Sequence, residues 1–275
     1  YETFGISISL PLSVRHGSTC VCKRQRSSHI GTRISTEHFL ANQSVHIKSV
    51  CNGYSNGSEQ EKLSSISREE NGNVVKVLVV LAHPSEESFV SYLASEVIAG
   101  LKTSGHEVRH HDLWAENFSP VFTPYERLNH VGDVAEKLRA LPELQQHIED
   151  LQWCEALVLV YPTWWSGQPA MLKGWFDRVL MNGVAWVLPE GAARIRPLLT
   201  NVRHLIVVTT HGSGKFVNAL EGESGKRTVF RSVRLMLHRR VRCEWLAMYG
   251  IDNATPLQRQ KFSARVRRRI SRVLG

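Results

Sequence analysis

The stretch Ala156-Leu-Val-Leu-Val-Tyr-Pro-Thr-Trp-Trp-Ser-Gly-Gln-Pro-Ala-Met-Leu-Lys-Gly-Trp-Phe-Asp-Arg178 determines the fold of this chain. Its uninterrupted apolar start predicts a strand buried on both faces, and from Pro169 the apolar positions follow helical spacing. Trp164 and Trp165 lie on the loop between strand and helix. Ligands of an open α/β sheet bind at the carboxyl ends of its strands. The loop therefore predicts a site for a flat aromatic ligand.

Two further strands end in loops suited to the same ligand. The apolar run 75–81 leads into Ala82-His-Pro-Ser-Glu-Glu-Ser-Phe89, where we expect Ser85 to cap a helix that begins near Glu86. The free amide groups of that helix would attract an anion, although the carboxylates of Glu86 and Glu87 oppose one, so the sequence leaves a phosphate here open. A third run, 204–210, ends in His211-Gly-Ser-Gly214, whose small residues allow close approach of the backbone to a ligand.

The whole core alternates strands with helices, which predicts parallel crossovers and a sheet covered on both faces. We expect an α/β fold with a doubly wound, five-stranded parallel sheet. The predicted strands are 74–81, 107–111, 156–161, 203–210 and 241–249. The predicted helices are 86–103, 168–182, 227–238 and 256–273, and helical material is expected over 125–151.

Three motifs, AHPSEESF at 82–89, VYPTWWSGQPAMLKGWFDRV at 160–179 and VVTTHGSG at 207–214, resemble the flavodoxin-like NAD(P)H dehydrogenases (quinone), the quinone reductase group. The resemblance extends from about Val74 to about Arg272. It implies a flavodoxin-like fold, a bound flavin (FMN or FAD) and a homodimer. It also implies two-electron hydride transfer from NAD(P)H to a quinone-like acceptor by a ping-pong mechanism.

Carried over onto this sequence, the resemblance implies three groups of cofactor-binding residues and assigns no catalytic side chain. The groups are His83, Ser88 and Phe89 around the flavin phosphate and ribityl chain; Pro162, Thr163, Trp164 and Trp165 along the isoalloxazine; and Thr209, Thr210, Gly212 and Ser213 at its pyrimidine edge. Asp177 and Arg178 are interpreted as structural charges.

The chain departs from the best-known animal members of that group at two places. Val90 stands where those members have Asn, which weakens the inference about the cofactor tail. The stretch 215–224 contains neither the Tyr nor the His to which a proton relay is attributed in those members. The relay is therefore not transferred to this chain.

Two other function classes remain open at this point. Some proteins that resemble this chain are regulatory or ancillary subunits of ion-efflux systems, and steady NAD(P)H oxidation with a quinone would distinguish an enzyme from such a subunit. A one-electron flavodoxin carrier is the third reading. Such carriers are usually acidic, whereas this chain carries a formal charge of +9.

The basic residues are concentrated near 227–242 and 259–272. We interpret them as solvated helix faces, with attraction to an anionic cofactor or surface as the alternative. Nucleic-acid binding is not expected, because the basic residues lack interleaved stacking aromatics. No apolar run approaches the roughly 18 residues of a membrane helix.

Neither the histidines nor the cysteines predict a metal site. His110, His111, His204 and His238 are expected at the surface or in loops, and none has a second ligand at metal-binding spacing. Cys154 and Cys243 are interpreted as small core residues, which fits a reducing compartment.

Residues 1–73 differ in composition from the rest, being rich in Ser, Asn, Thr and Gly. We expect a disordered extension ahead of a flavodoxin-like flavin-binding domain at 74–275. The basic, hydroxyl-rich segment 1–36 resembles an organelle transit peptide. An untargeted extension is equally compatible, so the expected location is the cytoplasm or, if the segment targets, a mitochondrion or plastid.

Overall fold

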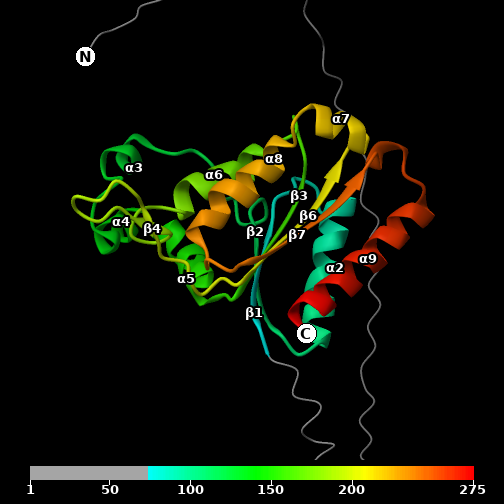
Figure 1. The fold of residues 1–275 in the computed structure, drawn as a ribbon, viewed down its shortest axis with the longest axis horizontal. Coiled ribbons are helices and arrows are strands. Elements are labelled where there is room, and N and C mark those ends of the chain that lie inside the picture. The colour runs from blue at the N-terminus through cyan, green and yellow to red at the C-terminus, as the bar shows by residue number, and fades with distance from the viewer. Residues whose placement is uncertain (1–73) are drawn as a thin grey trace, which may run out of the picture. The chain divides into compact units, whose positions relative to one another are not determined.

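The computed structural model describes residues 74–275, and five parallel strands form the centre of this part (Figure 1). They are β1 (Lys76–Leu81), β2 (Glu107–Asp112), β3 (Ala156–Pro162), β6 (His204–His211) and β7 (Arg242–Tyr249). Their order in the sheet is β2-β1-β3-β6-β7. This is the doubly wound order of the flavodoxin-like fold, whose ligands bind where the order reverses, between β1 and β3. The predicted fold class is confirmed.

Helices cover both faces of the sheet (Figure 1). On one face, α2 (Phe89–Thr103) packs beside α9 (Pro256–Leu274) and buries one hydrophobic cluster with the sheet. On the other face, α5 (Gln145–Trp153) and α6 (Ala170–Val179) bury a second cluster. The central strand β3 is buried along its whole length, which explains its unbroken apolar sequence.

The helical material predicted over 125–151 is divided into several short elements. The chain forms α3 (Pro124–Leu128), α4 (Val134–Ala140), the 3-10 turn η1 (Pro142–Leu144) and then α5. Leu141 takes φ −131° and ψ 60°, because the residue before a proline is disfavoured in helical conformation. Asp133 caps α4 by accepting a hydrogen bond from the Glu136 amide.

Two other helix boundaries differ from expectation. Helix α2 begins at Phe89, capped by Ser88 rather than by Ser85, because Ser85 is held by His83 in the preceding turn. The predicted helix 227–238 is a chain of short turns: α8 (Ser224–Arg227), the π-helical η2 (Thr228–Ser232) and the 3-10 turn η3 (Val233–Met236). The remaining elements are α7 (Lys215–Leu220), η4 (Ile251–Asn253) and the small antiparallel pair β4 (Trp186–Val187) and β5 (Arg196–Pro197).

Helix α6 is fixed in place by two contacts of its buried face. A Cβ added at Gly174 would lie 2.2 Å from the Pro120 carbonyl oxygen, so only glycine lets the 115–123 loop lie against the helix. Arg178, whose side chain is 2 % exposed, donates to Glu126 Oε1 at 2.7 Å and to Glu143 Oε1 at 2.7 Å. These bonds support the interpretation of Arg178 as a structural charge.

The predicted extension, residues 1–73, lies outside the described residues, as do Cys20, Cys22 and Cys51. Within the part of the chain that the structure describes, no helix is both long and apolar enough to cross a membrane.

Candidate functional site

Two adjoining hollows lie at the carboxyl ends of the strands, where the three motif loops meet. The tryptophan hollow, about 710 Å³, is lined by Thr163, Trp164, Trp165, Ser166, His211, Gly212, Ser213, Asn218, Glu221 and Ser224. The α2 hollow, about 400 Å³, is lined by His83, Ser88, Phe89, Val90, Pro162, Thr163, Trp164, Thr210, Gly212, Ile251 and Asp252. Thr163, Trp164 and Gly212 belong to both, so the two hollows form one composite cleft.

Ten of the eleven residues predicted to bind the cofactor line this cleft, and Thr209 does not. Thr209 is fully buried beneath it, and its Oγ1 lies 3.0 Å from the Thr163 Oγ1. Thr209 therefore supports the hydroxyl of a lining residue instead of meeting a ligand itself.

The α2 hollow offers donors for an anion. Ser88 Oγ accepts from the Ser91 amide, which leaves the amides of Phe89 and Val90 as the free first-turn donors of a 15-residue helix. His83 Nδ1 lies 3.0 Å from both the amide nitrogen and the carbonyl oxygen of Ser85, so this ring nitrogen is held in the turn before the helix. The guanidinium of Arg259 lies 5.9 Å from the Phe89 ring centre and adds a positive charge nearby. Glu86 and Glu87 do not line the hollow, whereas the carboxylate-bearing Asp252 does.

The tryptophan hollow is bordered by a strained turn. Trp164 and Gly167 exchange backbone hydrogen bonds of 3.2 and 3.0 Å around a two-residue tip. Both tip residues have positive φ, 49° for Trp165 and 58° for Ser166. Glycine or asparagine normally occupies such positions, because a side chain there costs about 1 kcal/mol. The Trp165 side chain is nevertheless fully exposed. Strain and an exposed indole at one residue indicate a functional position rather than a packing role.

Gly212 lies close to the end of the Asp252 side chain. A Cβ at this position would lie 2.7 Å from Asp252 Oδ2, so a larger residue would displace the Asp252 side chain from the α2 hollow. The glycine therefore leaves the backbone of this loop accessible to a ligand from both hollows.

His211 is the buried imidazole of the cleft, and its hydrogen bonds define its tautomer. Asn218 Nδ2 donates to the carbonyls of Ser213 and Gly214, so Asn218 Oδ1 accepts from His211 Nδ1 at 2.7 Å. The proton is therefore on Nδ1, and Nε2 faces the Thr163 hydroxyl at 3.4 Å. Burial lowers the pKa of His211, while Glu223 and Glu221 act in the opposite direction.

Sequence reasoning missed three lining residues, because His211 occupies the unassigned position of the Thr-Thr-x-Gly motif and Asn218 and Glu221 lie beyond the motifs. The stretch 215–224, which lacks the Tyr and His of the animal enzymes, forms α7 and a turn whose Ser224 hydroxyl donates to the Ser166 carbonyl at 2.7 Å. His211 stacks on Tyr249 with ring centres 4.6 Å apart, and Tyr249 donates to Glu223 Oε1 at 3.1 Å. The only clue in the sequence was the histidine inside the Thr-Thr-x-Gly motif.

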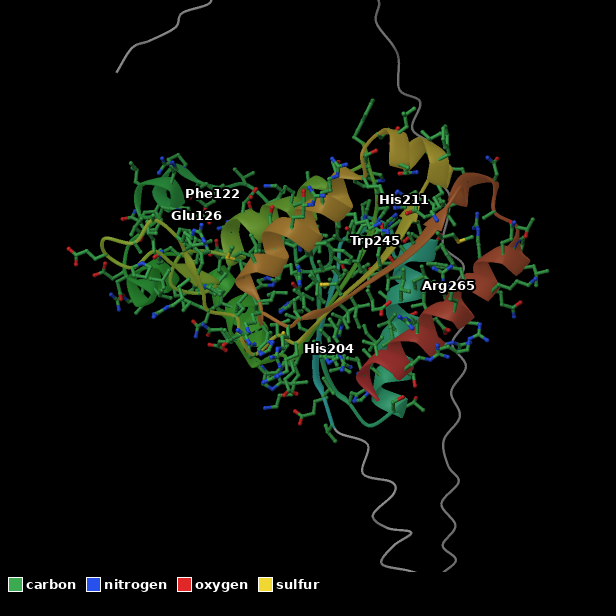
Figure 2. All side chains as sticks on the ribbon, viewed as in Figure 1. Phe122, Glu126, His204, His211, Trp245 and Arg265 are labelled. Atoms are coloured by element: carbon green, nitrogen blue, oxygen red, sulfur yellow. The ribbon has the colours of Figure 1, made fainter. Side chains whose placement is uncertain are left out.

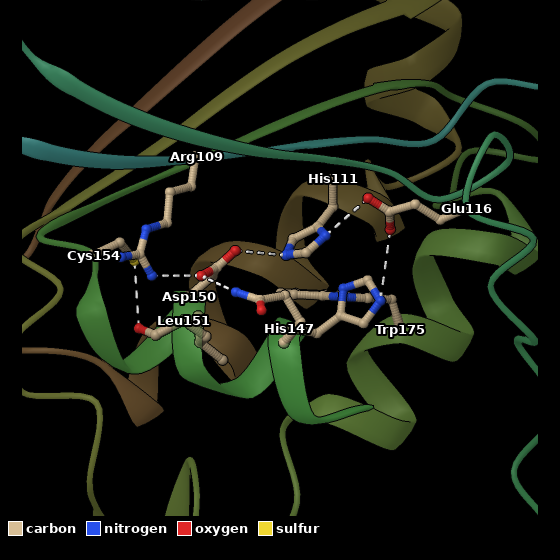
Figure 3. Close-up of polar contacts among 9 residues, drawn as sticks. Arg109, His111, Glu116, His147, Asp150, Leu151, Cys154 and Trp175 are labelled. Carbon is tan, nitrogen blue, oxygen red and sulfur yellow. Dashed lines mark hydrogen bonds and ion pairs between the residues drawn. The ribbon is translucent and has the colours of Figure 1, made fainter. Parts of the chain in front are cut away.

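His111, Glu116 and His147 form a polar cluster outside the two hollows (Figure 3). His111 was expected at the surface but is buried, because α5 covers the end of β2. Candidate ligand atoms of His111, Glu116 and His147 lie within 4.8 Å of one another, a proximity in space that the spacing of these residues along the chain does not indicate. Spacing along the chain misses this group because His111 and His147 are 36 positions apart.

The hydrogen bonds of this cluster oppose a metal ion. Trp175 Nε1–H donates to His147 Nδ1 at 3.3 Å, so the neutral ring carries its proton on Nε2, the atom that faces Glu116 Oε2 at 3.6 Å (Figure 3). Coordination through Nε2 would require the proton on Nδ1, against the Trp175 N–H. Burial, with the neighbouring His111, lowers the pKa of His147 to about 4.

The other residues left to structural roles lie as predicted where the structure describes them. Cys154 is buried, donates to the Leu151 carbonyl at 3.4 Å, and has a pKa raised by burial to about 12. Cys243 is half-buried, and burial also raises its pKa. Neither thiol lines the cleft, which agrees with their interpretation as small core residues.

Comparisons with known proteins agree with this architecture. The chain is 31% identical over 168 residues to NAD(P)H dehydrogenase (quinone) 1 of Rattus norvegicus, covering 57% of this chain and 60% of that protein. It is 35% identical over 111 residues to the uncharacterized NAD(P)H oxidoreductase YcaK of Escherichia coli, covering 40% and 55%. An NAD(P)H:quinone oxidoreductase structure from Methanothermobacter marburgensis superposes with a TM-score of 0.57 at 25% identity, covering 71% of this chain and 94% of that chain.

The chain spans 60% or less of the length of these two curated relatives. A family model described as a flavodoxin-like fold matches residues 75–274, which is most of the chain and includes every loop of the cleft. The resemblance stated from the three motifs is thereby confirmed, and the chain belongs to the flavodoxin-like family whose members include the NAD(P)H dehydrogenases (quinone).

Proposed function

We propose that this chain is a flavin-dependent NAD(P)H:quinone oxidoreductase that transfers two electrons by a ping-pong mechanism. The observation that carries the proposal is the composite cleft. It joins an anion-binding helix end to an aromatic-bordered hollow through Thr163, Trp164 and Gly212. An FMN or FAD, with a phosphate at one end and a flat ring at the other, matches that pairing.

The residues present fit such a cofactor. The Phe89 and Val90 amides and Arg259 would hold the phosphate, and the indoles of Trp164 and Trp165 would border the ring. When bound, the flavin supplies the redox chemistry. The backbone of Gly212 and Ser213 is exposed at the ring end, where donors stabilise negative charge that develops on hydride transfer.

We assign His211 a positioning role in that site. With its proton on Nδ1, Nε2 can accept from the Thr163 hydroxyl, which in turn meets the Thr209 hydroxyl at 3.0 Å. This chain of contacts fixes the direction in which Thr163 presents its hydroxyl to the cleft. The variant His211→Gln keeps one hydrogen-bond acceptor, whereas His211→Leu keeps none. His211→Gln should therefore change the KM for the quinone less than His211→Leu does.

Cofactor extraction and steady-state kinetics test the proposal. The purified full chain should be yellow and release FMN or FAD on denaturation. It should oxidise NAD(P)H in the presence of a quinone, with parallel double-reciprocal lines. Intersecting lines would argue for separate donor and acceptor sites. A chain that binds flavin without oxidising NAD(P)H would favour the ancillary-subunit reading.

We further propose a homodimer. A group of exposed apolar side chains lies on α3 and its flanks, as expected of a surface covered by a second copy. They are Val121, Phe122, Tyr125, Leu128 and Val131. The molar mass measured by light scattering during size-exclusion chromatography distinguishes a dimer from a monomer.

A further inference from the structure

A third hollow lies at the opposite edge of the sheet, where β6 and β7 begin. We call it the basic hollow. It encloses about 660 Å³ and is lined by Arg203, His204, His238, Arg239, Arg240 and Arg242. His204 begins β6 and His211 ends it (Figure 2), so the two sites are separated by seven residue steps, about 23 Å of strand. Nothing in the proposed redox reaction uses this hollow.

The backbone beneath the basic hollow is tightly held. His204 pairs with Arg242 in the register of β6 and β7, and the Arg242 amide donates to the Arg203 carbonyl at 2.8 Å. The turn that leads into β7 is closed by His238, whose Nδ1 accepts from the Arg240 amide at 3.1 Å. The basic side chains therefore project from fixed positions around one concavity.

The charge of this hollow is not compensated by the described part of the chain. The guanidinium groups of its four arginines make no ion pair with any carboxylate between residues 74 and 275. Other arginines do have such partners, as Arg269 has Glu244 at 2.6 Å. Four like charges around a cavity repel one another, and a bound anion relieves that repulsion. The cluster is thus arranged for a ligand rather than for internal ion pairs.

His204 lines the hollow among these arginines and responds to their charge. Its Nδ1 is buried and has no hydrogen-bond partner among the described residues. Burial lowers the pKa of His204, and Arg242 and Arg203 lower it further, while Glu155 acts in the opposite direction. Because Nδ1 has almost no accessible surface, a ligand in the hollow would act on the His204 ring through its charge and not by bonding to this atom. An anion in the hollow would raise the pKa of His204.

We propose that the basic hollow binds an anion that carries two or more phosphate groups. Arginine forks match phosphate oxygens in pairs, and the cavity volume falls within the range of small-molecule sites. The lining contains no Phe, Tyr or Trp on which a base could stack, so the phosphates themselves are what the site recognises. A free polyphosphate and a multiply phosphorylated lipid headgroup share this chemistry.

Calorimetric titration of the full chain with tripolyphosphate, pyrophosphate and orthophosphate, in metal-free buffer at fixed salt, tests the proposal. Affinity should rise with the number of phosphates at one-to-one stoichiometry. The double variant Arg239→Gln/Arg242→Gln should lose at least tenfold in affinity for tripolyphosphate. The matched control Arg231→Gln/Arg272→Gln removes the same charge from exposed positions outside the hollow and should lose less than threefold. Equal losses in the two variants would reduce the effect to net charge and overturn the proposal.

Nuclear magnetic resonance of the imidazole protons locates the site independently of affinity. Saturating tripolyphosphate should raise the pKa of His204 and leave that of His211 unchanged, since His211 lies at the far end of β6. An unchanged pKa of His204 would refute the assignment even if tripolyphosphate bound. This measurement uses the unmodified chain, so it does not depend on the folding of any variant.

Vesicle sedimentation separates the two sources of the anion. Vesicles containing phosphatidylinositol bisphosphate are compared with phosphatidylserine vesicles of equal total charge. Retention by the first alone, lost in Arg239→Gln/Arg242→Gln and competed by tripolyphosphate, identifies a lipid headgroup. Tripolyphosphate binding without vesicle retention identifies a free ligand. Equal retention by both vesicle types would show attraction to charge without a site and would overturn the proposal.

Discussion

Replacing Trp165 with glycine should separate the folding role of this residue from its binding role. Relief of the left-handed conformation favours the folded state by about 1 kcal/mol. The greater freedom of glycine in the unfolded chain opposes this by about 0.5–1 kcal/mol. The fully exposed indole loses no burial. The thermal midpoint of the apoprotein should therefore change by no more than about 3 °C.

Ligand binding should respond differently to the same change. Stacking of a flat ring on an indole contributes about 1–3 kcal/mol, so loss of Trp165 should weaken flavin affinity by about 5- to 150-fold. Titration of apoprotein with FMN and with FAD, followed by quenching of flavin fluorescence, measures this. Trp114→Ala is the matched control, because Trp114 is partly exposed and lines neither hollow; its affinity should stay within about twofold.

Wild-type flavin affinity in a folded Trp165→Gly variant would refute the argument that strain marks a binding residue. If the variant keeps its flavin affinity and also elutes as a smaller particle than the wild type in size-exclusion chromatography, Trp165 belongs to a subunit interface.

Three further outcomes are expected. Arg178→Met should lower the free energy of unfolding by about 3–5 kcal/mol, because it leaves the buried Glu126 carboxylate unpaired. The control Lys173→Met, in an exposed ion pair, should lower it by under about 0.5 kcal/mol. Urea unfolding measures both variants, and equal effects would contradict the buried network. His147, with its folded pKa lowered to about 4, binds a proton more readily in the unfolded chain, so stability present above pH 6.5 should be lost as pH falls toward 4. His147→Gln should flatten that slope between pH 7.5 and 5, and an unchanged slope would assign it to other groups. Deleting residues 1–72 should leave flavin content and quinone reduction nearly unchanged, because every residue that lines the cleft follows Val74. Loss of flavin from this variant would show that the extension belongs to the site. The cellular distribution of the same variant tests whether the extension is a targeting signal.

The sheet could be predicted closely because its determinants are local. A strand covered on both faces needs continuous apolar residues, and the predicted 156–161 became Ala156–Pro162. The break at Leu141 has a signal in the sequence, since a proline follows it, and this signal marks one of the points where the helical material predicted over 125–151 is divided.

Features that depend on distant segments could not be predicted in the same way. The burial of His111 requires α5, more than thirty residues further along the chain, to cover it. The tautomer of His211 follows from Asn218, whose amide is itself oriented by two carbonyls. No sequence pattern indicates a tryptophan with positive φ, because that conformation is disfavoured for every residue with a bulky side chain. The loops of the cleft were thus identifiable, whereas the arrangement of groups within them was not.

Gly174 places a limit on how this protein can be made more heat-resistant. Replacing a helical glycine with alanine is a common route to a higher melting temperature, because alanine propagates helix better by about 1 kcal/mol. Here the added methyl would meet the Pro120 carbonyl at 2.2 Å, and α6 could accept it only by moving away from the loop. The same helix continues the Trp164–Pro169 turn, so that movement would reach the rim of the cleft. Variants designed for higher thermal stability that contain alanine at position 174 should therefore lose ligand binding.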